Sequence, residues 1–173
     1  MNRKKEFSKI YDEYINKIYR FIFLKVSSED IAKDLCSETF LRGWEVYQDN
    51  PNIKNPSALL YRIAQNLIID YYREKERTNF ISTELVSLAD PRPNLEEKAI
   101  INSDLNLIKT CLANLKDEYQ NVIIWRYLDD LSIEETAKLL GRTEENTRVL
   151  LHRALKALRN EVNKKSKKEI KEA

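Results

Sequence analysis

Residues 132–158 (SIEETAKLLGRTEENTRVLLHRALKAL) constrain the fold most, because they predict two helices joined by a three-residue turn. Ser132 and Glu135 have the spacing of a capping box, in which each side chain accepts a hydrogen bond from the other residue's free backbone N–H. Gly141 suits the left-handed conformation at a helix end, which glycine adopts at little cost. Thr143 is placed to cap the second helix, whose first turn is acidic. A helix, a short glycine-containing turn and a second helix are typical of the DNA-binding helix-turn-helix motif.

The second helix of this pair has two distinct faces when its residues are placed at intervals of about 100°. One side is a stripe that is expected to pack inward: Thr147, Leu151, Ala154, Leu158 and Val162. The other side is mostly basic and free to contact DNA: Arg148, Val149, His152, Arg153 and Lys156. Arginine can donate two hydrogen bonds to guanine, and histidine can bond base edges or phosphate. The alternative is a solvated face of an ordinary amphipathic helix, and the caps and the glycine turn favour DNA binding over it.

Charge is unevenly distributed along the chain, although the formal net charge is only +2. Residues 142–168 contain nine Lys or Arg and three Asp or Glu, whereas residues 115–135 contain two basic and six acidic residues. A basic segment of this kind suits phosphate groups and supports the DNA-binding interpretation. The basic tail at 164–173 is expected to be frayed, and it serves either weak electrostatic attraction or solubility alone.

The composition predicts an all-α protein of the cytoplasm. Of 173 residues only two are glycine and four are proline, 34% are charged, and no segment alternates like a strand. The basic start of the chain lacks the apolar stretch of a signal peptide, and no apolar run approaches the ~20 residues that cross a bilayer. Cys36 and Cys111 lack metal-ligand spacing, so buried, reduced thiols are expected.

The chain is expected to fold as two small helical domains joined by a flexible linker. Helical periodicity is lost near the middle, where Pro91 and Pro93 lie in an acidic segment, 78–104, with two basic and five acidic residues. An ordered surface loop within one domain is the alternative. The predicted organisation is a front domain at 1–77, the acidic linker at 78–104, a back domain at 105–163 with the helix-turn-helix, and the basic tail at 164–173.

The front domain contains three long helical patterns, beginning with an apolar stripe over residues 7–22. A cap at Ser27 is expected to begin the second helix. Asn55 before Pro56 is a favourable start for the third helix, which is expected to end in the charged run 73–77. Aromatic residues beside cationic ones in this third helix suit stacking on unpaired bases, although tyrosines at helical spacing are more often core.

Three segments, in this order and separation, resemble the extracytoplasmic-function (ECF) sigma factors: EDIAKDLCSETFLRGWE (29–45), LLYRIAQNLIIDYYR (59–73) and residues 132–158. These are small bacterial sigma factors with two helical domains, which bind core RNA polymerase and direct it to promoter DNA. The resemblance covers about residues 7–77 and 105–162, nearly everything except the linker and the tail. It implies an anti-sigma factor as a further partner, and no catalytic residue, metal or bound cofactor.

The resemblance also implies functional residues, position by position. The helix that docks on core polymerase in this family matches Asp34, Leu35, Glu38, Thr39, Phe40 and Arg42. The pocket for a flipped-out base of the minus-ten promoter element matches Arg62 and Asn66, since an amide offers a donor and an acceptor to a base edge. The loop 48–55 matches the one that closes over that base. The contacts to the minus-thirty-five element match Arg148, Val149, His152 and Arg153.

The chain departs from the family pattern at several positions. Leu59 stands where the family often has tryptophan, and the loop before Pro56 has an unusual composition, so the preferred minus-ten base is left open. Leu150 replaces a common arginine and is expected to remove a phosphate contact. Thr147 replaces a common valine in the packing stripe and is expected to cost a little stability.

Other classes of protein are disfavoured by the same residues. A polymerase-independent helix-turn-helix transcriptional regulator normally binds paired half-sites as a dimer and leaves the front domain unexplained. A purely helical adaptor is a further alternative. An enzyme is disfavoured because the one histidine, His152, lies on the DNA face and the sequence has no glycine-rich phosphate loop. Trp125, Tyr127 and Leu128 are expected either to meet a partner or to be core, and core is favoured for at least two of them.

Overall fold

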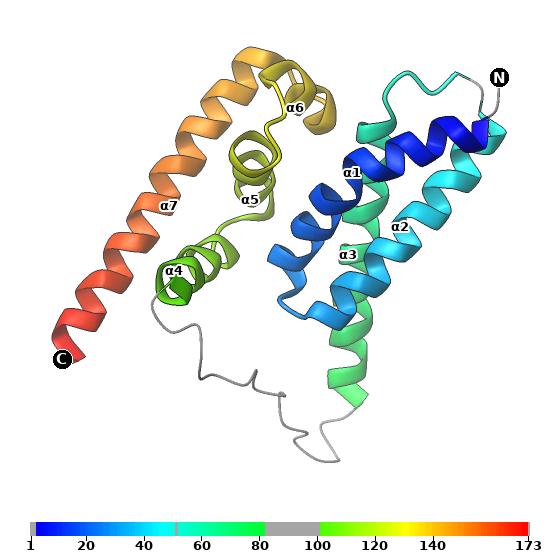
Figure 1. Ribbon diagram of the computed structural model, residues 1–173. Coiled ribbons are helices and arrows are strands. Elements are labelled where there is room, and N and C mark those ends of the chain that lie inside the picture. Colours follow the sequence, from blue (N-terminus) through cyan, green and yellow to red (C-terminus); the bar gives the residue numbers. More distant parts are fainter. Residues whose placement is uncertain (1–2, 51, 82–100, 173) are drawn as a thin grey trace. The chain divides into compact units, whose positions relative to one another are not determined.

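The structure, a computed structural model, describes the backbone of residues 3–50, 52–81 and 101–172. Within these ranges every regular element is a helix, which confirms the expected all-α class. The chain divides into two compact units, residues 1–92 and 93–173 (Figure 1). Among the described helices, none has the length and apolar character needed to cross a bilayer.

Three helices pack against one another in the first unit: α1 (Arg3–Val26), α2 (Glu29–Asp49) and α3 (Pro56–Ile81), blue to green in Figure 1. Their shared core consists of side chains almost entirely removed from water: Ile18, Phe21, Ile22, Ala32, Leu60, Tyr61 and Ala64. Gly43 lets α2 and α3 approach closely, because a Cβ atom on it would lie 2.7 Å from Leu60 Cδ2. The inner faces of α2 and α3 are therefore in direct contact at Gly43 and Leu60.

Local interactions determine where the helices of this unit begin. Asn55 caps α3 as expected, because its Oδ1 atom accepts hydrogen bonds from the Ala58 N–H at 3.0 Å and the Ser57 hydroxyl at 2.7 Å. The cap expected at Ser27 is wrong by one residue, since the N-cap of α2 is Ser28, which makes no side-chain capping bond. Ser27 instead has a left-handed backbone with φ 59°, a conformation that suits the turn at the end of α1.

The second unit is built around one long helix. Its elements are α4 (Ile101–Ala113), α5 (Asp117–Ile123), a π-helical turn η2 (Ile124–Leu128), α6 (Ile133–Leu140) and α7 (Glu144–Glu172). The helix α7 packs against α4, α5 and α6. The core at this junction consists of Leu112, Leu115, Val122, Ile123, Leu150 and Ala154. Because three helices contact α7, its buried face is broader than a single stripe.

The turn η2 places three large side chains differently, although the sequence does not decide whether each is core or meets a partner. Trp125 is fully buried, whereas Tyr127 is 55% exposed and Leu128 is 38% exposed. The prediction that at least two of the three are core is therefore wrong. Asp129 N donates to Ile124 O at 3.0 Å across a wider turn than an α-helix has, and this wider turn changes which following side chains face the core.

The helix-turn-helix has the predicted geometry. Ser132 N donates to Glu135 Oε2 at 2.7 Å and Glu135 N donates to Ser132 Oγ at 3.1 Å, which completes the capping box. Gly141 ends α6 in the left-handed conformation with φ 64°. Asn146 N donates to Thr143 Oγ1 at 3.2 Å, so Thr143 caps α7. Local bonds therefore fix the three-residue turn from both sides.

Removing the capping box is expected to destabilise the second unit. Ser132→Ala removes the acceptor of the Glu135 N–H, so we expect the free energy of unfolding to fall by about 1 kcal/mol. Chemical denaturation followed by circular dichroism measures this change. Ser37→Ala is the matched control, because the Ser37 hydroxyl donates only to the Lys33 carbonyl, at 2.9 Å on an exposed face of α2. An equal loss in both variants contradicts the stabilising role of the cap.

The helices on either side of the predicted linker extend further than expected. The helix α3 continues to Ile81 rather than ending in the run 73–77, and α4 already begins at Ile101. Both ends of the predicted linker 78–104 are therefore helical, and its central part, 82–100, lies outside the described residues. Arg, Glu and Lys are good helix formers, so a helix can continue along a charged run without a core beside it.

The tail is also helical, because α7 continues through most of residues 164–173 to Glu172. The expectation of a frayed tail is therefore wrong for its backbone. Lysine and glutamate at helical spacing support this extension, and Lys164 Nζ lies 2.8 Å from Glu161 Oε1 at its start.

Candidate nucleic-acid and protein interfaces

The outer face at the start of α7 is the first candidate site. Its basic side is exposed at every predicted position: Arg148, Val149, His152, Arg153 and Lys156. On the opposite side Thr147 and Ala154 are fully buried, and the other three residues of the predicted stripe are half-buried. The structure therefore confirms the two faces of this helix, while the contacts of single residues with DNA stay predictions.

The expectation that Leu150 removes a phosphate contact is corrected, because this side chain lies in the core. It is 6% exposed and packs in one cluster with Val122 and Ala154. Leucine at this position is therefore a core residue and not a lost phosphate contact. Thr147 also suits its buried position, since its hydroxyl donates to the Thr143 carbonyl at 2.9 Å and is satisfied there.

Arg148 is held by an ion pair within α7. Its Nη2 atom lies 2.8 Å from Glu144 Oε2, and both side chains remain about half exposed. Exposed ion pairs of this kind contribute at most about 1 kcal/mol. Arg148 can therefore exchange Glu144 for a phosphate group or a guanine edge at small cost.

The second candidate site lies on α3, where Arg62 and Asn66 are exposed one helical turn apart. Ile69, which is 46% exposed, extends the same face by another turn. Tyr61 beside them is fully buried and packs edge-to-face on Phe21, with ring centroids 5.4 Å apart. Tyr61 is therefore a core residue, as tyrosines at helical spacing usually are. The polar chemistry of this face comes from Arg62 and Asn66.

The loop next to this face is shorter than predicted. The helix α2 continues through Asp49 and ends where Asn50 N donates to Val46 O at 3.1 Å. The first two residues of the predicted loop 48–55 are therefore helical. Only residues 50–55 connect α2 to α3, and Pro51 among them lies outside the described residues.

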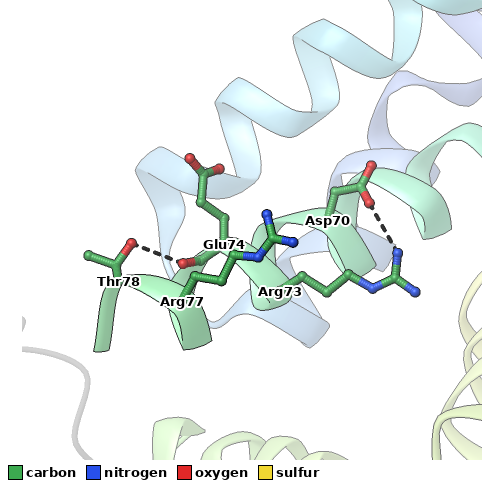
Figure 2. Close-up of a pocket in the computed structure, with 5 residues that line it drawn as sticks. All are labelled: Asp70, Arg73, Glu74, Arg77 and Thr78. Atoms are coloured by element: carbon green, nitrogen blue, oxygen red, sulfur yellow. Dashed lines mark hydrogen bonds and ion pairs between the residues drawn. The ribbon is translucent and has the colours of Figure 1, made fainter. Parts of the chain in front are cut away.

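The outer end of α3 forms a shallow groove lined by Asp70, Arg73, Glu74, Arg77 and Thr78 (Figure 2). Arg73 Nη1 lies 3.8 Å from Asp70 Oδ1, and the Thr78 hydroxyl donates to the Glu74 carbonyl at 2.9 Å. Two arginines and two carboxylates give this groove no net formal charge. Its electrostatics therefore do not favour an anion, and the candidate site on α3 remains the pair Arg62 and Asn66.

The outer face of α2 is the third candidate site, and it requires two corrections. Asp34 and Arg42 are exposed, and Leu35 and Glu38 are partly exposed, as a docking surface requires. Thr39 and Phe40, by contrast, are 0% and 5% exposed. The Thr39 hydroxyl donates to the Leu35 carbonyl at 2.7 Å, and the Phe40 ring packs on Tyr11 with centroids 4.8 Å apart. Neither residue presents its side chain to a partner.

Sequence reasoning missed Leu41, the most exposed large apolar side chain of α2 at 55%. Asp34, Glu38, Leu41 and Glu45 follow one another at spacings of four, three and four residues, so they form one stripe along the helix. We call these four residues the α2 stripe. The sequence indicates this stripe, because Leu41 shares a helix face with three acidic residues and that face is opposite the buried residues of α2.

Two ion pairs join charged groups one turn apart on α2. Arg42 Nε lies 2.6 Å from Glu38 Oε1, and Lys33 Nζ lies 2.7 Å from Glu29 Oε1. The hydrogen bond from Lys33, together with its charge, lowers the pKa of the Glu29 carboxyl, and the same contacts raise the pKa of Lys33. The α2 stripe itself carries three acidic side chains and no basic one, so it is predominantly acidic.

Cys36 lies on the inner side of α2, where burial raises the pKa of its thiol from 9.0 to about 11. We expect iodoacetamide to modify it very slowly in the folded protein and quickly after unfolding, as mass spectrometry can measure. Because the folded-state pKa is the higher one, the free energy of unfolding is expected to fall as the pH rises from about 9 towards 11. Cys36→Ala should reduce this pH dependence, and rapid labelling of the folded protein contradicts the prediction.

Comparison with known proteins covers most of the chain. A family model described as Sigma-70 region 2 matches residues 10–78, and one described as Sigma-70, region 4 matches residues 105–158. The ECF RNA polymerase sigma factor SigW of Bacillus subtilis is 31% identical over 168 residues, covering 90% of this chain and 88% of SigW. BldN of Streptomyces coelicolor is 28% identical over 158 residues, which are 88% of this chain but only 58% of BldN.

Two solved structures share the fold. The sigma factor RpoE, in its complex with the anti-sigma factor NepR from Bartonella quintana, has a TM-score of 0.70 at 20% identity and covers 92% of this chain and 98% of RpoE. CnrH, in its complex with the cytosolic domain of CnrY, has a TM-score of 0.62 at 18% identity and covers 92% of this chain and 89% of CnrH. The family models and the SigW match place the chain in the family that its three motifs resemble: it is an ECF RNA polymerase sigma factor.

Proposed function

We propose that this chain binds core RNA polymerase in the cytoplasm and directs it to promoters by reading two DNA elements with two different units. The observation that carries the proposal is the division of exposed chemistry between the units. A basic helical face on α7 suits duplex DNA, while an acidic stripe on α2 and an amide–arginine pair on α3 suit a protein and an unpaired base. The chain itself catalyses no reaction in this proposal, because it supplies only binding and positioning.

The second unit reads the minus-thirty-five element as duplex DNA. In a helix-turn-helix the second helix enters the major groove, and residues near its N-terminus contact base edges. The exposed side chains in that position on α7 are Arg148, Val149, His152 and Arg153. Arginine can bond guanine in a bidentate manner, and the surrounding basic residues of α7 attract phosphates and so increase affinity for any sequence.

The first unit captures a base of the minus-ten element after the duplex opens. The Asn66 amide offers both a donor and an acceptor to the base edge. Arg62 lies one turn away and can meet a phosphate or the same base. Capture of an unpaired base stabilises the melted state, so no hydrolysis is required to open the DNA. The loop 50–55 between α2 and α3 closes over the captured base in this proposal.

The α2 stripe is the surface that docks on core polymerase. It keeps Asp34 and Glu38 from the docking set inferred from the sequence and adds Leu41 and Glu45, while Leu35 and Arg42 flank it. Thr39 and Phe40 leave the set, because their side chains are buried and support the helix from inside. An apolar anchor surrounded by acids suits a basic partner surface with a small apolar pocket. The ion pair between Glu38 and Arg42 is exposed and weak, so Glu38 can reorient toward such a partner at small cost.

An anti-sigma factor is proposed as a further partner. RpoE and CnrH, which share this fold, were each solved in a complex, RpoE with an anti-sigma factor. A regulator that covers the α2 stripe would keep the chain from polymerase without altering the protein chemically. Competition between the purified regulator and core polymerase for the labelled chain tests this partner.

Reconstitution with core polymerase tests the proposed function directly. The purified chain is expected to comigrate with core polymerase and to permit run-off transcription from specific promoters, which core polymerase alone does not support. A polymerase-independent regulator would instead bind duplex DNA without core and produce no transcript. Failure to bind core polymerase at low ionic strength overturns the proposal.

A further inference from the structure

Val149 is an apolar side chain on an otherwise polar surface. It is 50% exposed, and the other large apolar side chains described in α6 and α7 are all buried or half-buried. Its neighbours at three- and four-residue spacing on the helix surface are Glu145, Asn146, His152 and Arg153, all exposed. Val149 therefore lies in the middle of the candidate DNA face and contributes nothing to the core of the unit.

The position of Val149 along α7 also matters. It is the sixth residue of the helix, counted from Glu144, and so belongs to the first two turns. Those turns approach base edges when the second helix of a helix-turn-helix enters the major groove. The basic residues Arg148 and Arg153 lie close to it in sequence and suit the phosphates on either side of a groove. In this mode of docking, an exposed side chain between them faces the base edges.

The chemistry of the side chain restricts what it can recognise there. An isopropyl group neither donates nor accepts hydrogen bonds, so it leaves any polar base edge that it covers without a partner. Among the four bases, only thymine presents an apolar group in the major groove, its C5-methyl. We propose that Val149 selects a thymine in the minus-thirty-five element by contact with this methyl group. This inference rests on the proposed function, in which α7 reads duplex DNA.

Replacing thymine by deoxyuridine tests the contact, because this change removes only the methyl group. The promoter is first identified by sequencing transcripts that the reconstituted holoenzyme initiates on genomic DNA. Each thymine of its upstream element, on either strand, is then replaced singly, and holoenzyme binding is measured. At one position we expect the wild-type affinity to fall about fourfold, as expected for one methyl group that is no longer buried.

Variants of the protein assign that loss to Val149. With Val149→Ala, thymine and deoxyuridine at the sensitive position are expected to bind equally, because the methyl group has lost its partner. Val149→Ile keeps an apolar branched side chain and is expected to keep the preference for thymine. Lys156→Ala is the control for charge, since it should weaken binding to all sequences while leaving the preference for thymine unchanged. Thermal melting confirms that each surface variant is folded.

The possible results separate this inference from the proposed function. Specific promoter binding in which every deoxyuridine replacement is silent overturns the role of Val149 and leaves the proposed function standing. The same holds if the upstream element contains no required thymine, or if Val149→Ala retains the full preference. A wild-type holoenzyme without promoter specificity overturns both. Loss of the methyl preference only in Val149→Ala supports the inference.

Discussion

Leu41→Glu is expected to weaken binding of the chain to core RNA polymerase by at least about 30-fold, the effect of losing one central apolar anchor. Leu41 is 55% exposed within an acidic stripe, so the free protein gains little from it. Glutamate removes the apolar contact and would place a further carboxylate in the partner's apolar pocket, where it is costly to desolvate. Titration of the fluorescently labelled chain with core polymerase measures the dissociation constant.

Val46→Glu is the matched control for this prediction. Val46 is 38% exposed on the same helix, and five residues after Leu41 its side chain points about 140° away from that of Leu41. The same apolar-to-acidic change there should alter the affinity for core polymerase by less than about threefold, and equal melting temperatures show that both variants are folded. Comparable binding losses in the two variants would mean that added charge, rather than the anchor, explains the effect. Unchanged binding by Leu41→Glu removes Leu41 from the docking surface.

The parts of the fold that the sequence predicts are those fixed by contacts between residues close in the chain. The boundaries of α6 and α7 depend on the Ser132–Glu135 capping box, on Gly141 and on Thr143, which act within four residues of their own positions. Asn55 fixes the start of α3 in the same way. Such interactions are visible in a sequence because their spacing is set by the helix itself.

Burial was harder to predict because it depends on elements distant in sequence. Leu150 is core because α4, α5 and α6 all pack on α7, which makes its buried face broader than one stripe. Thr39 and Phe40 point toward the other helices of the first unit, together with Ala32, Cys36 and Gly43, whereas Leu41 points away. A family motif gives residues in chain order and does not say which of two adjacent residues faces outward.

The turn η2 could not be predicted for a different reason. A single widened turn changes which of the following side chains face the core. The sequence presents Trp125, Tyr127 and Leu128 as one apolar group, and only Trp125 is core. Polarity patterns assume 3.6 residues per turn, and the hydrogen bond from Asp129 N to Ile124 O breaks that period locally. No residue in this segment signals the change, which is why helical periodicity failed there.

Asn66→Ala is expected to reduce stable promoter opening by about 1–3 kcal/mol, or roughly 5- to 150-fold, if the amide makes paired hydrogen bonds to a captured base. Asn66 is exposed on α3 and its removal leaves the core of the first unit intact, so binding to core polymerase should not change. The fraction of open complexes is measured by permanganate reactivity of unpaired thymines. Binding of the holoenzyme to a single-stranded minus-ten oligonucleotide should weaken by a similar factor.

Two further substitutions decide whether Asn66 acts through its hydrogen bonds. Asn66→Asp keeps the size of the side chain but replaces the amide donor by a second acceptor, so it should be at least as defective as Asn66→Ala. Asn16→Ala makes the same change at an exposed position of α1 and should leave opening unchanged. If Asn66→Asp opens promoters normally, the side chain only fills space. If Asn66→Ala also opens every promoter as the wild type does, base capture depends on other groups, and Arg62 becomes the next polar candidate on that face of α3.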